Sequence, residues 1–230
     1  MNASPTSNPM SARKNYTSTE GYTEIVKPGE MGITKLHFGI LTLTPQTTFF
    51  DHSDDAEVAL IALGGHCTLL VGHNGNKAYG VLGERSNVFE GEACVAHIPH
   101  HTTYEMLVGE AGVEIAVCKV ESHSESAAVI LEAGETAPEQ ETHLRIWENI
   151  ADVSTSDTPV IPTQGEAICF YRSLDVNRSA VFEVTRTVGD KRTARVQLSN
   201  NDVLMLSEQD NILSLTSEGG GYQLWVQPNL

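Results

Sequence analysis

Imidazole and carboxylate side chains recur in the N-terminal half of the chain. Glu57 follows His52 closely, and His97 and His101 come later in the same half. When such side chains converge from neighbouring strands, they can bind a divalent ion and leave one position open for a substrate oxygen. We therefore consider His52, Glu57 and His101 as candidate metal ligands, with His97 as the substitute for His101. The alternative is that His52 and His101 are surface side chains in polar loops.

A second interpretation of the same region needs no metal. Arg85 offers a planar, bidentate guanidinium, and Glu57, His97 and Tyr104 offer single hydrogen bonds. Together these groups are suited to the carboxylate and hydroxyls of a sugar acid. The competing interpretation is that Arg85 pairs with Glu84 or Glu90 at the surface and contributes little.

Charge and composition limit the partners. Thirty acidic residues against fourteen basic ones give a formal charge of −16, which repels a phosphate backbone and an anionic membrane alike. We expect a small-molecule ligand and no nucleic acid or membrane partner. Residues 1–22 are polar and lack the apolar run of a signal peptide, which predicts a disordered leader on a cytoplasmic protein. The four cysteines lie in apolar runs without a C-x-x-C pair, which predicts buried, reduced thiols.

The candidate site residues lie in or beside short β-rich runs that are separated by Gly, Asn and Asp. Gly64-Gly65 and residues 73–76 supply the positive φ angles that close hairpins, and no segment sustains a helical period. Residues 122–165 are rich in Ser, Glu, Thr and Pro, which is typical of a linker. The sequence predicts an all-β chain with a first barrel over 23–121, a linker over 122–165 and a shortened second barrel over 166–230. The expected strands are 57–63, 66–71, 77–82, 93–98, 113–120, 167–172, 180–186, 193–198, 202–206, 211–216 and 222–226.

Four segments of the chain carry a family resemblance. LGERSNVFEG (82–91) and EVALIALGG (57–65) resemble the L-G-x-R-x-x-V-F and E-x-x-L-x-x-L-x-G patterns of 5-deoxyglucuronate isomerases. EAICFYR (166–172) and GYQLWV (221–226) are similar to that family's E-x-Y-Y-Y-R and G-Y-x-x-Y strands. The family is related to the ketol-isomerases of 4-deoxy-L-threo-5-hexosulose-uronate. The resemblance implies tandem cupin-like barrels of the jelly-roll type, aldose-ketose isomerisation of a deoxyuronate in myo-inositol breakdown, and a divalent metal, zinc or manganese, in the second barrel.

The chain departs from the family pattern at that metal site. The P-P-H-x-H segment is missing, Asn211 stands where the family has the histidine of a G-Y-H-P turn, and no histidine follows His143. Of the expected ligands Glu166 alone remains, and one carboxylate is too few for a zinc-type ion. By resemblance Glu166 is the catalytic candidate, with a strand carboxylate paired to Arg172 as the alternative.

Tyr171 and Arg172 are further substrate-binding candidates, although an aromatic residue in a strand is usually core. The first barrel also keeps the later part of the first cupin motif, in which Glu57 and Gly64 follow His52. In its second motif Tyr104 stands where cupins carry a histidine.

Two functions stay open at this stage. One is a sugar-acid isomerase that moves a proton between adjacent carbons with a carboxylate or histidine as base. The other is a non-catalytic bicupin that has lost its metal site and acts as a carbohydrate-binding, regulatory or partner subunit. Cupins often pair through strand edges, so a homo-oligomer is possible.

Overall fold

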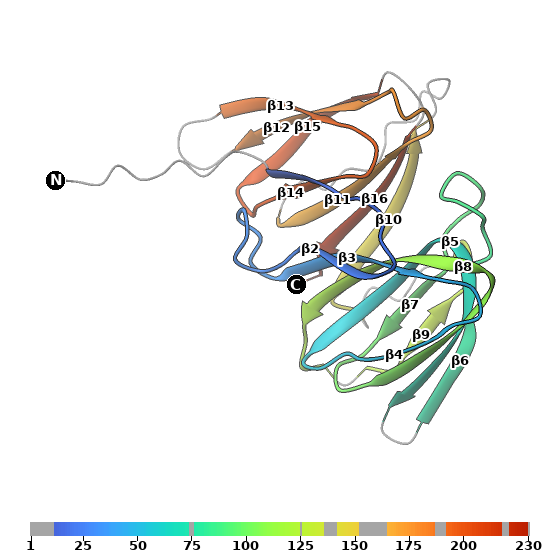
Figure 1. The fold of residues 1–230 in the computed structure, drawn as a ribbon. Helices are drawn as coiled ribbons and strands as arrows, with labels where there is room; N and C mark the ends of the chain where they lie inside the picture. The colour runs from blue at the N-terminus through green and yellow to red at the C-terminus, as the bar shows by residue number, and fades with distance from the viewer. Residues whose placement is uncertain are drawn as a thin grey trace.

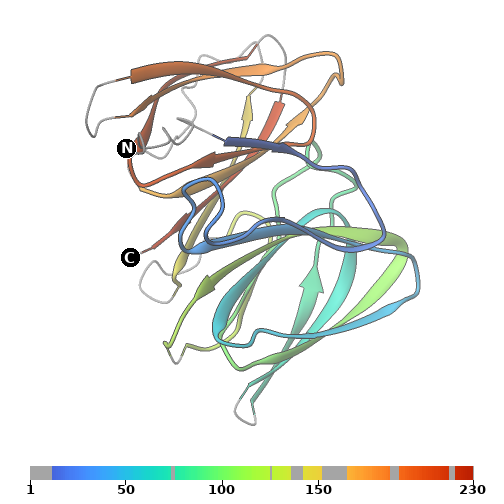
Figure 2. The same cartoon turned by 60° about the vertical axis from the view of Figure 1, so that its left-hand side comes forward.

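The structure is a computed structural model that describes residues 12–73, 76–124, 126–135, 142–151, 165–186, 192–217 and 221–229. Within these ranges every helix or strand element is a β-strand, as the sequence predicts. The strands form two units, one above the other in Figure 1 and again in the turned view of Figure 2. None of the described residues form a helix that is long and apolar enough to cross a membrane.

The first unit is a single antiparallel sheet that curls around its own interior. Its two longest strands, β5 and β8, pair along most of their length and bend together. Four of its strands have one partner each: β2 pairs with β3, β4 with β8, β6 with β5 and β9 with β7. The strands are β2 (Gly21–Val26), β3 (Leu36–Leu43), β4 (Thr48–His52), β5 (Ala56–His73), β6 (Asn76–Leu82), β7 (Val95–Ile98), β8 (Thr103–Glu121) and β9 (Val129–Leu131).

The second unit consists of two facing sheets. One has the order β1-β14-β11-β16-β10 and the other the order β13-β12-β15. The strands are β1 (Ala12–Asn15), β10 (Leu144–Ala151), β11 (Ala167–Ser173), β12 (Ala180–Arg186), β13 (Arg192–Leu198), β14 (Asp202–Leu206), β15 (Asp210–Ser217) and β16 (Gly221–Pro228).

Three apolar cores hold the molecule together. One fills the first unit, with Leu60, Leu69 and Ile115 among its members, and another fills the second unit. The third lies between the units, where Phe38 and Ile40 of β3 pack with Phe170 of β11 and Leu224 of β16. The two units are therefore joined by a shared apolar core and not by a tether alone.

Strand β5 shows how the sequence produces this arrangement. Val58, Leu60 and Ala62 face the interior of the first unit, whereas Ala59, Ile61 and Leu63 face the core between the units. A strand that is buried on both faces reads as a continuous apolar run, which is what residues 58–63 show. The alternation also fixes Glu57 on the face that points toward the second unit, since side chains two residues apart share a face.

The expected boundaries differ from the structure at both ends of the linker and in the leader. Ala12–Asn15, expected in a disordered leader, form β1 and pair with β14; residues 1–11 lie outside the described residues. The expected linker contains β9, which joins the first sheet, and β10, which pairs with β16 along its whole length. The segment 166–230 is short, but the second unit is larger than this segment. Strands β1 and β10, which lie outside 166–230 in the sequence, complete its sheet.

Candidate functional site

Glu166 lies directly before β11 and is almost fully buried. Its Oε2 accepts hydrogen bonds from the backbone N and the hydroxyl of Thr34, both at 2.7 Å. Its Oε1 accepts from the backbone N of Lys35 at 3.0 Å and of Leu36 at 2.8 Å. Four donors saturate a carboxylate that has about four acceptor positions. The structure thus places the catalytic candidate as a connection between the second unit and the loop before β3.

The interior of the second unit is packed with apolar side chains. Trp225 is fully buried and contacts Phe182 of the opposite sheet edge-on, with ring centroids 6.0 Å apart. Trp147 of β10 stacks against Trp225 at 6.4 Å. Tyr171 is also fully buried in this core. Tyr171 therefore lies in the second core, the alternative that the sequence left open for it.

Arg172 points the other way, toward the first unit. Its two terminal nitrogens donate to the Glu114 carboxylate of β8 at 2.7 and 2.6 Å, and its Nε donates to Asn201 at 3.0 Å. The guanidinium also lies over the Phe170 ring, 5.1 Å from its centroid. Arg172 thus pairs with Glu114 and not with Glu166.

Arg85 is 5% exposed and lies in the segment between β6 and β7. It donates to the carbonyl of Ala62 at 3.0 Å and, through both terminal nitrogens, to Glu148 of β10 at 2.7 and 3.2 Å. The Tyr222 hydroxyl donates to the same carboxylate. Arg85 therefore does not form the expected surface pair with Glu84 or Glu90. Its guanidinium is also not open to bind an anion, because Glu148 already occupies it. The Arg85 side chain is held inside the interface of the two units.

Glu57 and His97 meet, but a third residue, His143, completes the group. The Glu57 carboxylate accepts from the backbone N of His143 at 2.9 Å and lies 3.1 Å from its Nδ1 and 3.4 Å from the Nδ1 of His97. Burial raises the pKa of Glu57, but the hydrogen bonds from His97 and His143 outweigh it and hold the pKa below its ordinary value. This cluster ties β10 to the first unit.

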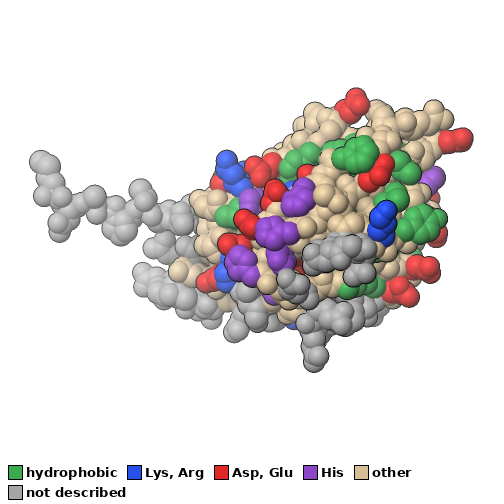
Figure 3. Space-filling model, turned by 90° about the horizontal axis from the view of Figure 1, so that it is seen from below, with side chains coloured by type: hydrophobic (Ala, Val, Ile, Leu, Met, Phe, Trp, Pro, Cys, Tyr) green, Lys and Arg blue, Asp and Glu red, His purple; other side chains and the backbone are tan. Residues whose placement is uncertain are grey.

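The remaining candidates lie at one rim of the first unit. The rings of His52 and His101 are 6.5 Å apart, and those of His100 and His101 are 4.8 Å apart. Acidic side chains accompany them, since His52 lies 3.0 Å from Asp54 and His101 lies 3.4 Å from Asp55. In the view from below, histidine side chains gather beside acidic ones (Figure 3). The structure therefore brings His52 near His101 but leaves Glu57 with a different pair of histidines.

Tyr104 is buried in the first core, and its hydroxyl donates to Asp51 at 2.7 Å. Burial, and secondarily the nearby Asp51 carboxylate, raises the pKa of Tyr104. The phenol is therefore a neutral hydrogen-bond donor already engaged with the protein.

The family's metal does not fit the side chains of the second unit. Imidazoles are lacking after His143, and the one remaining carboxylate of the expected set, Glu166, is saturated by donors of the protein. Across the described ranges no three His, Cys, Asp or Glu side chains are grouped so that they could hold an ion.

Sequence reasoning missed Glu148, Glu114 and His143, which engage Arg85, Arg172 and Glu57. Each lies far along the chain from its partner, by 63, 58 and 86 positions. For Glu148 a signal exists, because it directly follows the apolar residues Leu144, Ile146 and Trp147. For the pairings themselves the sequence carries none.

Fold and site together define a two-barrel protein of the cupin type in which the expected site residues connect the barrels. Solved structures agree with this class. An IolB-like protein from Salmonella typhimurium is 18% identical, with a TM-score of 0.75 over 94% of this chain and 92% of that one. Oxalate decarboxylase from Lactobacillus farciminis is 8% identical, with a TM-score of 0.64 over 94% and 86%. The enzyme from Bacillus subtilis, as a mutant, is 14% identical, with a TM-score of 0.62 over 98% and 78%.

The model of the KduI/IolB family matches residues 10–161, and the chain belongs to this family. Membership supports a sugar isomerase-like function and confirms the resemblance found in the sequence. No curated protein matches the chain.

Proposed function

We propose that this chain is a non-catalytic member of the KduI/IolB family, a bicupin that works as a binding, regulatory or partner subunit. The observation that carries the proposal is the saturation of Glu166. Its two oxygens take four hydrogen bonds from Thr34, Lys35 and Leu36. A general base needs a lone pair that reaches substrate, and this carboxylate has none to spare.

The packing of the second unit supports the same proposal. Small-molecule sites are concave, and a few polar groups converge in them. Here the positions between the two sheets are taken by Trp225, Phe182 and Leu204, all fully buried. Their packing stabilises the fold in place of a ligand.

The proposal is tested by assaying 5-deoxyglucuronate isomerisation with protein supplied with Zn²⁺ or Mn²⁺ and with protein treated with a chelator. We expect no turnover in either sample. The Glu166→Gln variant should lower the free energy of unfolding by about 1–3 kcal/mol, because an amide N–H then faces backbone donors. Glu121→Gln, at a glutamate whose side chain is 79% exposed, is the matched control and should change little. Brisk turnover that the chelator abolishes would contradict the proposal.

A second candidate, aldose-ketose isomerisation of a deoxyuronate in inositol breakdown, is favoured by the family match. It requires a sugar acid as ligand and a base other than Glu166. Calorimetric titration with glucuronate, combined with the turnover assay, separates the two candidate functions. Heat of binding together with turnover supports the isomerase, and the absence of turnover supports the non-catalytic bicupin. The cytoplasmic location is part of both proposals and is supported by four buried free cysteines. Homo-oligomerisation is likewise proposed, and light scattering tests it.

A further inference from the structure

Four strands of the first unit have an inner face in the first core and an outer face that carries exposed side chains. Their order is β4-β8-β5-β6, with the first half of β8 and the second half of β5 in the middle. Leu69, Val71 and Met106 lie on the inner face, because they belong to the first core. Successive side chains of a strand point to opposite faces, so the chain neighbours of these residues lie on the outer face.

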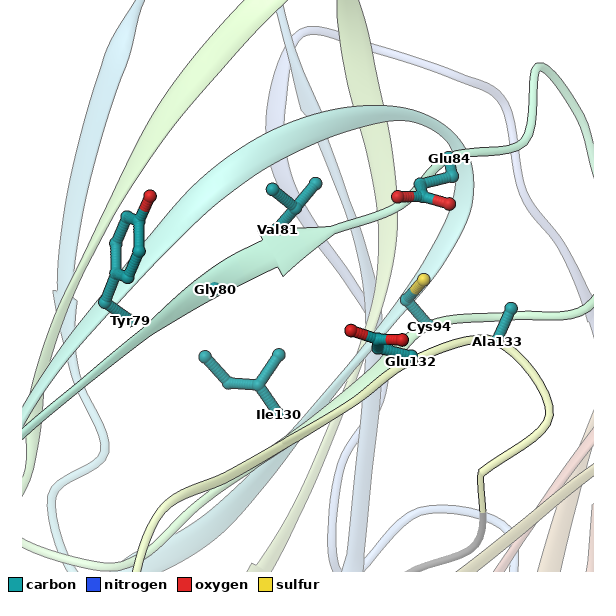
Figure 4. Close-up of a pocket in the computed structure, with 8 residues that line it drawn as sticks. All are labelled: Tyr79, Gly80, Val81, Glu84, Cys94, Ile130, Glu132 and Ala133. Atoms are coloured by element: carbon teal, nitrogen blue, oxygen red, sulfur yellow. The ribbon is translucent and has the colours of Figure 1, made fainter.

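The registers of the ladders align the outer side chains in two rows, which we call the outer-sheet patch. Across the four strands one row is Phe50, Glu105, Leu70 and Tyr79, and the next row is Thr48, Leu107, Thr68 and Val81. Figure 4 shows Tyr79 and Val81 on one side of β6 and Ile130 on the other. A Cβ atom at Gly80 would lie 3.2 Å from the Ile130 side chain, so Gly80 faces away from the patch.

The patch is apolar on a face where an antiparallel sheet that meets water normally alternates to polar residues. Its exposed apolar residues are Phe50 at 68%, Tyr79 at 75%, Val81 at 47% and Leu107 at 43%. Since an aromatic side chain buries 150–250 Å² when fully covered, Phe50 and Tyr79 alone present roughly 200–350 Å² to water. A contiguous exposed apolar patch of this size marks an interaction site.

The charge of the patch limits what covers it. Glu105 is the one residue of the patch that is charged at neutral pH, whereas the whole chain has a formal charge of −16. A basic partner would be attracted to the acidic remainder of the surface and not to this face. The complementary surface is therefore flat, apolar and nearly uncharged. The same patch on a second copy of the chain meets this description, and two sheets pack face to face about 10 Å apart.

We propose that the outer-sheet patch is the contact through which two copies of this chain form a symmetric dimer. A two-fold contact joins the same surface of both copies. With the axis parallel to the strands and midway between β5 and β8, Phe50 lies opposite the partner's Tyr79, and this aromatic contact occurs twice. A specific interface buries about 800 Å² per copy. The two aromatic side chains supply roughly a quarter to two fifths of this area.

This inference rests on the homo-oligomerisation proposed above and names its surface. Pairing is face to face through an outer sheet and not through strand edges. It is independent of the chemistry of Glu166, because the patch belongs to the first unit.

Sedimentation velocity of the full chain over a range of concentrations tests the dimer. We expect a reversible dimer that becomes tighter as NaCl is added, because salt screens the repulsion between two acidic copies. The Phe50→Ser/Tyr79→Ser double variant should raise the dissociation constant at least about 30-fold, the effect of losing a hot spot of 2 kcal/mol. Its melting temperature at low concentration should equal that of the wild type, since both side chains are exposed in the monomer.

Leu174→Ser/Val176→Ser is the matched control, because these residues are 66% and 71% exposed in the segment between β11 and β12. It should dimerise as the wild type does. Three results overturn the inference. A wild type that is monomeric throughout also contradicts homo-oligomerisation. A Phe50→Ser/Tyr79→Ser variant that dimerises as tightly as the wild type leaves homo-oligomerisation in place through another surface. A monomeric wild type that cosediments with phosphatidylcholine vesicles would mark the patch as a lipid contact.

Discussion

The guanidinium of Arg85 and the carboxylate of Glu148 form a bidentate ion pair across the interface of the two units. The side chain of Arg85 is 2% exposed and that of Glu148 is 18% exposed. Burial alone lowers the pKa of an arginine, but the hydrogen bond to Glu148 and the charge of the surrounding groups raise the pKa of Arg85 above its ordinary value. Arg85 therefore keeps its charge inside the interface, and the loss of either partner leaves the other without its hydrogen bonds.

Replacement of Arg85 by methionine should destabilise the protein strongly. A buried pair that loses one partner costs about 3–5 kcal/mol, measured here as the free energy of unfolding in urea. Arg195→Met is the control, since Arg195 is 78% exposed in its pair with Glu183, and the loss there should stay below about 1 kcal/mol. Equal losses in the two variants would show that Arg85 does not connect the units.

Glu57 predicts a specific pH dependence of stability. Its pKa is lower in the folded chain than in the unfolded one, because His97 and His143 donate to the carboxylate. The stabilisation from a lowered pKa is fully present above the unfolded pKa and is lost as the pH falls through the folded value. We therefore expect the free energy of unfolding to fall as the pH drops below the ordinary glutamate pKa of about 4.3.

In the Glu57→Gln variant this part of the acid loss should disappear, and stability at pH 7 should be lower than in the wild type. Urea unfolding from pH 7 to pH 3 measures both effects. Glu121→Gln, whose side chain is 79% exposed, should keep the wild-type pH profile. An unchanged profile in Glu57→Gln would place the acid sensitivity elsewhere.

The sequence predicts the strands well where apolar alternation and glycine act locally. The expected hairpin at Gly64-Gly65 is wrong, however: residues 57–63 and 66–71 form one bent strand, β5, because Gly64 and Gly65 shift the register against β8 without ending the strand. Prediction from the sequence fails for β1, because its residues Ala12–Asn15 are mostly polar. Such a strand exists only because β14 offers an edge, and tertiary pairing overrides weak local preference.

The site could be predicted only in part, for a related reason. Several of the residues singled out for chemistry are buried polar groups, as Glu57, Arg85 and Glu166 show. Their types mark them as residues that need partners, but the partners lie far away in sequence. Residue type therefore identified the positions of strong interactions, and only the fold distinguishes a catalytic group from a structural one.

Arg172 and Glu114 form the second bidentate pair between the units, at 2.7 and 2.6 Å. A double-mutant cycle with Arg172→Met and Glu114→Gln should give a coupling free energy of about 0.5–3 kcal/mol, the range for residues in direct contact. The same cycle on Lys35 and Glu208, an exposed pair at 3.4 Å, should give a value near the lower end. Coupling close to zero for Arg172 and Glu114 would contradict the contact.

Gly65 lies where the pairing of β5 with β8 shifts register, and it should tolerate no side chain. Its φ is +78°, and a Cβ atom there would lie 2.1 Å from the carbonyl oxygen of Gly112. Gly91 has a similar φ of +85°, but a Cβ atom there meets nothing within 4 Å. Gly91→Ala should therefore cost only the backbone strain of about 1–2 kcal/mol. Gly65→Ala carries the same strain and a backbone clash, so its melting temperature should fall much further, as circular dichroism would record. A smaller loss for Gly65→Ala than for Gly91→Ala would mean that the two strands do not approach so closely.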